Sequence, residues 1–165
     1  AGFTEEILVR GVMLRLIEGW VGTWWALAIT AVFFGAAHLG NPQATVFGAV
    51  AIALEAGILL GACYLLTRRL WLAIGVHAAW NFVQGGIFGS DISGTGSGRG
   101  LIEARFTGPD LLTGGAMGIE GSVVAVVVCT AAGLAMLLAV RRRGLVVPPC
   151  WRRPPQAALD GTQPA

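Results

Sequence analysis

Charged residues are few in this sequence. Only 12% of its 165 residues are charged, no lysine occurs, and all eleven basic residues are arginine. Soluble domains carry about 25% charged residues, so a chain that is also 55% hydrophobic, with a mean hydropathy of +0.72, is not an ordinary soluble domain. The net charge of +2 is too small, and the basic residues too little interleaved with aromatic ones, to indicate nucleic-acid binding.

Cysteine is scarcer still, with three residues. Cys63, Cys129 and Cys150 show no CxxC spacing, and two of them lie in apolar runs. The pattern therefore indicates neither a disulfide framework nor a cysteine zinc site. The motifs HExxH and GxSxG are absent as well, and the absence of GxSxG argues against a serine intramembrane protease.

Long apolar runs, in contrast, fill the sequence. A helix needs about 20 apolar residues to cross the hydrocarbon core of a bilayer, and four segments meet that length: 20–39, 44–67, 70–89 and 121–140. Residues 1–19 are more polar and predict a fifth helix. We therefore expect an all-α fold, a polytopic bundle of transmembrane helices, in a prokaryotic plasma membrane.

The ends and connections give further expectations. The sequence begins without methionine or a signal peptide, so we expect earlier helices to be missing. We expect residues 1–143 to form a membrane-embedded core and the Pro- and Arg-containing segment 144–165 to be disordered. Two predicted spans separate the arginines at 68–69 from those at 141–143, and the positive-inside rule places both groups in the cytoplasm. The Gly-rich segment 90–120 then faces outward. A flexible connector is the favoured interpretation, and a loop that shields or admits substrate is the alternative.

Both histidines of the chain lie in apolar runs, and each has a partner one helical turn away. Phe34 precedes His38 by four residues and Asn81 follows His77 by four, a spacing that puts each pair on one helix face. An ionisable group near a bilayer centre costs about 2.5–3.5 kcal/mol on insertion scales, so such groups commonly mark a site. A single buried histidine is more often an interhelical contact, but two with matching partners indicate a site.

Glu5, Glu6 and Arg10 open the first apolar segment. Glu6 can pair with Arg10 four residues on, whereas Glu5 points about 100° away around the helix and can face a cavity. A bundle that turns this stripe and the two histidine stripes inward gathers a carboxylate, two imidazoles and an amide. We expect these catalytic residues, on several helices, to face one intramembrane cavity.

Such a group can hydrolyse a peptide bond. A desolvated carboxylate has a raised pKa, which suits a general base, and an amide and an imidazole can donate hydrogen bonds to the oxyanion. Glu5, His38 and His77 can alternatively bind zinc, with one position open for water. The spacing does not favour a metal over direct activation of water, so zinc and no cofactor stay equally open.

The patterns EExxxR, FxxxH and HxxxN, in this order on separate predicted helices, resemble the CPBP family of intramembrane proteases, also called the Abi family. This family includes type II CAAX prenyl endopeptidases and bacterial relatives linked to bacteriocin processing and self-immunity. The resemblance covers about residues 1–140. It implies a CAAX protease-like membrane endopeptidase of the metalloprotease class that acts on a peptide or protein substrate at the lipid bilayer.

The resemblance also implies residue roles. Its catalytic group has five members: Glu5, Glu6, His38, His77 and Asn81. Within this group Glu5 activates water and His38 assists it. Glu6 and Arg10 form the supporting pair of Glu5, and His77 with Asn81 forms the oxyanion or second-ligand pair. Phe34 has a packing role beside them.

A non-catalytic membrane protein is the alternative, either a proton-coupled transporter or a bacteriocin immunity-type binding protein. Glu55 interrupts the span 44–67 and belongs to none of the three patterns. It gives transport some support, because a proton relay needs ionisable groups spread across the membrane depth. A single acid of this kind is more often a protonated hydrogen-bond donor to a neighbouring helix. A protease, in contrast, needs its ionisable groups to converge.

Overall fold

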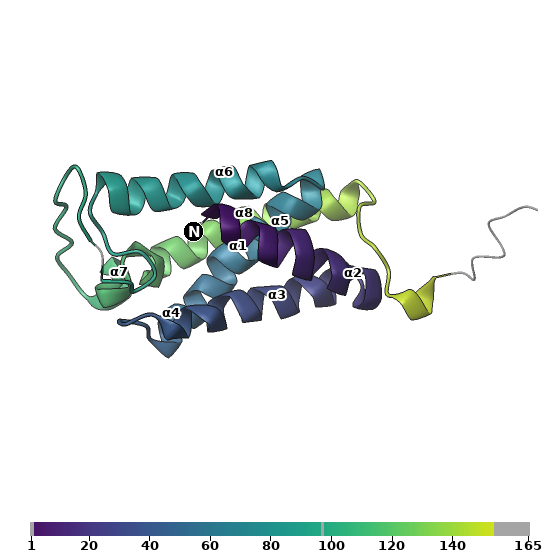
Figure 1. Ribbon diagram of the computed structural model, residues 1–165, viewed down its shortest axis with the longest axis horizontal. Helices are drawn as coiled ribbons and strands as arrows, with labels where there is room; N and C mark the ends of the chain where they lie inside the picture. Colours follow the sequence, from purple (N-terminus) through teal and green to yellow (C-terminus); the bar gives the residue numbers. More distant parts are fainter. Residues whose placement is uncertain (1, 97, 154–165) are drawn as a thin grey trace, which may run out of the picture.

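Helices make up the whole framework of the protein. The computed structural model describes residues 2–96 and 98–153, and these residues form no β-strand. Five helical rods lie along one another in an elongated bundle (Figure 1): α1 (Gly2–Glu6) with η1 (Ile7–Leu14) and α2 (Arg15–Val21); α3 (Thr23–Ala37) with η2 (His38–Gly40); α4 (Val46–Ile52) with η3 (Ala53–Gly57) and α5 (Ile58–Thr67); α6 (Leu70–Asn81) with η4 (Phe82–Ile87); and α8 (Val123–Arg142). The expected all-α fold is confirmed.

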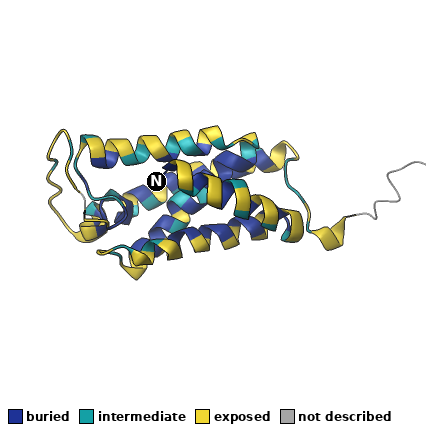
Figure 2. Cartoon of the chain, viewed as in Figure 1, coloured by how far each residue is buried: buried dark blue, intermediate teal, exposed yellow. Residues whose placement is uncertain are grey.

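Three rods are long and apolar enough to cross a membrane: Thr23–Gly40, Val46–Thr67 and Val123–Arg142. They agree to within a few residues with the predicted spans 20–39, 44–67 and 121–140. Buried residues line the bundle interior, whereas the outer faces carry many exposed apolar side chains (Figure 2). An exposed apolar surface of this extent fits the hydrocarbon region of a bilayer.

Two further predicted segments are helical but are not among these three candidate spans. Segment 70–89 contains His77, Asn81 and Gln84, whose polar side chains lower its hydropathy. The described part of segment 1–19, from residue 2 onward, belongs to the rod α1–η1–α2, which begins midway along the bundle and runs to the end where α2 turns into α3 (Figure 1). The carboxylates of α1 therefore lie inside the length of the bundle.

Close helix packing holds the central rods together. A Cβ at Gly35 would lie 2.2 Å from the carbonyl oxygen of Ala49, and one at Gly57 would lie 2.8 Å from Ala31 Cβ. Small residues of this kind let helix backbones approach closely. A hydrophobic core toward the α2 end of the bundle has seven buried members: Leu14, Leu27, Ala62, Tyr64, Leu65, Leu137 and Val140.

The chain after α8 turns back against the start of α3. Thr23 N donates to Val147 O at 3.0 Å, and Val147 N donates to Thr23 Oγ1 at 2.8 Å. η7 (Cys150–Arg152) follows. Residues 144–153, the first part of the segment for which disorder is predicted, are thus held on the bundle by hydrogen bonds. The rest of that prediction, 154–165, lies outside the described residues.

Arg68, at the end of α5, links the segment after α8 to α2. Its guanidinium forms an ion pair with Glu18 of α2 and donates to Leu145 O at 2.6 Å. Leu145 lies two residues after Arg143, so both arginine groups lie at one end of the bundle.

The segment between η4 and α8 folds back onto the opposite end rather than standing clear of it. Leu101 N donates to Gly86 O at 2.9 Å and Ile102 N donates to Ile87 O at 2.7 Å. The segment contains α7 (Asp110–Thr113), η5 (Gly115–Met117) and η6 (Ile119–Gly121). Met117 is buried, where its side chain fills the space above Gly48 of α4. The interpretation as a flexible connector therefore misses an ordered part of the fold.

Candidate active site

The second glutamate of the first motif is sealed inside the bundle with its arginine. Glu6 is 0% exposed and Arg10 1%, and Arg10 Nη1 donates to Glu6 Oε1 at 2.7 Å. Arg10 Nη2 also donates to the backbone carbonyls of Ala56 and Gly57, at 3.0 and 3.3 Å. The ion pair keeps the buried charge of Arg10 compensated. The two contacts with backbone carbonyls hold the first rod against η3.

His77 reaches the same carboxylate from α6. Its Nδ1 lies 2.9 Å from Glu6 Oε1, and because an ionised carboxylate only accepts hydrogen bonds, the ring nitrogen is the donor. In the neutral ring, a proton on Nδ1 leaves Nε2 as an acceptor. Gly2 permits this approach of α1 to α6, since a Cβ there would lie 3.1 Å from Ala78 N.

Glu5 presents its carboxylate on another side of the helix. Its side chain is 35% exposed, and its Oε2 lies 3.9 Å from His77 Nε2. That oxygen is itself buried and has no hydrogen-bond partner among the described residues. At 3.9 Å the two atoms are too far apart for a direct hydrogen bond. The two adjacent glutamates thus have different surroundings: Glu6 holds the histidine from inside, and Glu5 faces the outer groove.

Phe34 touches side chains of all three motifs. The centroid of its ring lies 4.8 Å from that of His38 and 5.9 Å from that of His77, both in edge-on geometry. Arg10 Cζ lies 4.4 Å from the same centroid. The ring of His38 is oriented from the backbone, because its Nδ1 donates to Phe34 O at 2.6 Å. Phe34 therefore packs where the motifs meet.

An open groove of about 330 Å³ joins these side chains. Its polar lining has six principal members: Glu5, His38, Asn41, His77, Asn81 and Ser93. Its apolar lining includes Leu8, Val9, Phe33, Phe34 and Ala37. The glutamate of the first motif, the histidine of the second and both polar residues of the third therefore meet at one surface.

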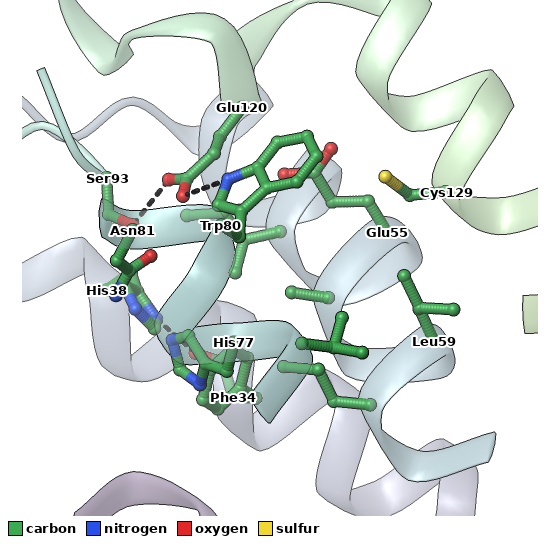
Figure 3. Close-up of a pocket in the computed structure, with 14 residues that line it drawn as sticks. Phe34, His38, Glu55, Leu59, His77, Trp80, Asn81, Ser93, Glu120 and Cys129 are labelled. Atoms are coloured by element: carbon green, nitrogen blue, oxygen red, sulfur yellow. Dashed lines mark hydrogen bonds between the residues drawn. The ribbon is translucent and has the colours of Figure 1, made fainter. Parts of the chain in front are cut away.

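A smaller cavity lies behind the groove and shares its histidines. It offers about 40 Å³ to water, and His38, His77 and Asn81 line both spaces. Glu120 and Ser93 close one side of this inner cavity and Glu55 the other (Figure 3).

Glu120 is a part of this region that the sequence patterns miss. It is 6% exposed, and it accepts hydrogen bonds from Trp80 Nε1 at 3.0 Å and from Ser93 Oγ at 2.5 Å. Burial raises the pKa of Glu120, while the hydrogen bonds from Ser93 and Trp80 act in the opposite direction. Its only signal in the sequence is a lone acid beside the last apolar run, which does not distinguish it from a residue exposed in a loop.

The three candidate zinc ligands do not form a metal centre in this geometry. Within residues 2–96 and 98–153, no group of three or more His, Cys, Asp or Glu side chains is arranged to hold a metal ion. Glu5 and His77 are 3.9 Å apart at their nearest charged atoms. The donor set as arranged does not fit a zinc ion.

Comparison with known proteins identifies the family. No curated protein and no solved structure matches the chain significantly. A family model described as "Type II CAAX prenyl endopeptidase Rce1-like" matches residues 1–83, a stretch that makes up half of the chain and contains all three motifs. The resemblance inferred from those motifs is confirmed. The chain belongs to the Rce1-like family of type II CAAX prenyl endopeptidases, which are helical membrane proteins.

Proposed function

We propose that this protein is an intramembrane endopeptidase in which Glu5 activates the attacking water. The observation that carries the proposal is the geometry of Glu5 Oε2 and His77 Nε2, which face each other across 3.9 Å at the wall of an open groove. A water between them donates one hydrogen to the carboxylate and the other to the imidazole. Its oxygen lone pair is then free to attack a carbonyl carbon.

The remaining steps use groups of the same groove. Glu5 takes one proton from the water as the new C–O bond forms, and Asn81 donates its amide hydrogen to the oxyanion. Because the Nδ1 proton of His38 is directed to Phe34 O, His38 first takes up a proton at Nε2 from a water of the site and then passes it to the departing amine as the C–N bond breaks. The proton held by Glu5 returns to the water of the site after product release. His77 is a less suitable oxyanion donor in its neutral form, because its proton on Nδ1 is directed to Glu6.

Glu6 and Arg10 do not contact the reacting atoms but position His77. The ion pair sets the tautomer and the orientation of His77, as a carboxylate commonly does for a catalytic histidine. No step is assigned to a metal, because the chain's own candidate ligands are not arranged to bind one.

The groove indicates a hydrophobic peptide segment as the substrate. Leu8, Val9, Phe33 and Ala37 provide an apolar wall next to the polar one. An extended chain with aliphatic side chains can bury them there while its scissile carbonyl lies near Glu5. The family description adds a specific class, so we propose a prenylated C-terminal peptide of the form Cys-aliphatic-aliphatic-X as substrate.

Quenched fluorescent peptides of this form test the proposal on the full-length protein in detergent. Prenylated and unprenylated versions are compared for the wild type, Glu5→Gln, His38→Ala and His77→Ala. Glu103→Gln, which alters an exposed carboxylate outside the groove, is the matched control. We expect cleavage by the wild type and the control only. Absence of cleavage by the wild type, with either peptide and with or without added zinc, contradicts the proposed function.

A further inference from the structure

The inner cavity contains a buried acid that the mechanism above leaves unused. Glu55, on η3, is 2% exposed, and its Oε2 has no hydrogen-bond partner among the described residues. The sequence interpretation of a hydrogen-bond donor to a neighbouring helix therefore finds no partner at this oxygen. Burying an unpaired polar group costs free energy, so a side chain kept in this state requires an explanation.

Glu55 and Glu120 line the same cavity but have different surroundings (Figure 3). Glu120 accepts hydrogen bonds from Ser93 and Trp80, and such bonds favour an ionised carboxylate. Glu55 has no comparable donor. Two carboxyl groups in one poorly solvated space do not both ionise readily, because like charges repel. The proton of this pair therefore belongs on Glu55.

Water can connect this acid to the groove. The cavity offers about 40 Å³ to water, and one water needs roughly 10–15 Å³ and two to four polar partners. Polar side chains that line the cavity supply those partners: Glu55, Glu120, His38, His77, Asn81 and Ser93. The cavity therefore has the volume and the polar lining that a short chain of water molecules between Glu55 and the histidines requires.

We propose that Glu55 is a proton-storing residue that supplies the active site through the water of the inner cavity. The inference rests on the proposed function. In the step concerned, Glu55 gives its proton to a cavity water, which passes a proton to His38 Nε2, and His38 gives a proton to the amine nitrogen as the C–N bond breaks. The proton that Glu5 took from the attacking water returns to Glu55 after product release. No net charge or electron is transferred.

Several titratable or charged groups face Glu55 from the surrounding elements. They are Glu120 of η6, Cys129 of α8, His38 at the end of α3, His77 of α6, and Arg10 of η1, which donates to the carbonyl of the next residue, Ala56. Among them Glu120 is the one whose negative charge opposes ionisation of Glu55. Its neutralisation should therefore let Glu55 lose its proton at lower pH.

Steady-state kinetics of the full-length protein with the prenylated quenched peptide test the proposal. Glu55→Gln should lower kcat by roughly 10²-fold, as for loss of a proton-transfer group, with little change in KM. In the wild type kcat should fall at high pH, where Glu55 loses its proton, and this limb should be absent in Glu55→Gln. Glu120→Gln should move it to lower pH, and Glu103→Gln should leave it in place. An unchanged kcat or an unchanged high-pH limb in Glu55→Gln overturns the proposal.

Two further measurements separate this proposal from its alternatives. The infrared carbonyl stretch of a protonated carboxyl group should be present in the wild type and in Glu103→Gln at neutral pH. In Glu55→Gln the contribution of Glu55 to this band should be lost, whereas Glu120→Gln should retain it. Detection of this band does not require peptidase activity. If the band is present but no peptide is cleaved, the proposed function is contradicted, whereas the assignment of a protonated Glu55 still holds. Absence of the band from the wild type overturns the inference even if the wild type cleaves peptide.

Thermal unfolding of Glu55→Gln should show no loss of stability. A lowered Tm that accounts for the lost activity assigns Glu55 a structural role and overturns the proposal.

Discussion

His77 Nδ1 and Glu6 Oε1 lie 2.9 Å apart, although α6 and α1 are separated by more than sixty residues of sequence. The same carboxylate oxygen accepts from Arg10 at 2.7 Å. One buried atom therefore orients the histidine and neutralises the arginine. Loss of Glu6 should affect both the fold and the site.

Glu6→Ala is expected to destabilise the protein by about 3–5 kcal/mol, since it leaves the charge of Arg10 buried without its partner. Thermal unfolding in detergent measures this effect. The double variant Glu6→Gln with Arg10→Leu removes both charges and should recover part of the stability. If the double variant is as unstable as the sum of its single variants, the two side chains are not coupled.

Glu5→Gln is expected to lower kcat by about 10²–10⁴-fold, because the amide cannot accept the proton of the attacking water. Its Tm should stay close to that of the wild type, because the side chain is 35% exposed and forms no short ion pair. Kinetics and thermal unfolding on the same preparation check both statements. A variant that retains wild-type kcat would falsify the role of Glu5 as base.

Asn81→Ala is expected to reduce kcat by about 10²–10³-fold, which is the usual effect of losing one oxyanion donor. The binding of uncleaved peptide should change little, since the amide contacts the oxyanion only as it forms. Asn81→Asp serves as a control of similar size that lacks the amide donor, and it should be equally impaired. Full activity of the Asp variant contradicts an oxyanion role.

Stability should depend on pH through Glu120. Burial raises the pKa of Glu120 above its ordinary value of 4.5, so the folded protein holds this proton more tightly than the unfolded chain. Its contribution to stability is fully present below about pH 4.5 and is lost as pH rises through the raised pKa. Glu120→Gln lacks this loss, so its stability relative to the wild type should increase with pH. Parallel unfolding curves of the two proteins at all pH values contradict the assignment.

Gly35→Ala is expected to destabilise the bundle by about 1–3 kcal/mol through overpacking, because the new Cβ would lie 2.2 Å from a backbone oxygen of α4. Gly75→Ala on α6 is the matched control, since no atom lies within 4 Å of its added Cβ. That change should be neutral or stabilising, because alanine favours a helix over glycine. Thermal unfolding distinguishes the two, and equal effects contradict the close approach of α3 and α4.

Apolar run length and helical spacing predict the parts of the fold that depend on local sequence. The spans around 20–39, 44–67 and 121–140 follow from hydropathy alone, and the spacing of Glu6 with Arg10 follows from the helical repeat. The contact between Glu6 and His77 depends on how two rods pack, which no single segment encodes. The helical repeat places Glu6 and His77 each on one face of its own helix, but it does not predict that these two faces meet.

The segment 90–120 and the start of the C-terminal tail could not be predicted in this way. Neither has a periodic apolar pattern, so their composition indicates loops. Ser93 and Glu120 become part of the inner cavity through hydrogen bonds across the fold, and Val147 is held by Thr23 in the same manner. Such pairings join residues far apart in sequence, and they leave no signal in local composition.

The separation of Glu6 and Arg10 by one helical turn also bears on how the protein is made. Each charge alone would cost about 2.5–3.5 kcal/mol near the bilayer centre on insertion scales. Because both belong to one helix, the salt bridge forms as soon as that turn does, before η3 and α6 are in place. The ion pair therefore needs no other rod in order to form, and His77 meets a carboxylate whose charge is already balanced when α6 packs against α1.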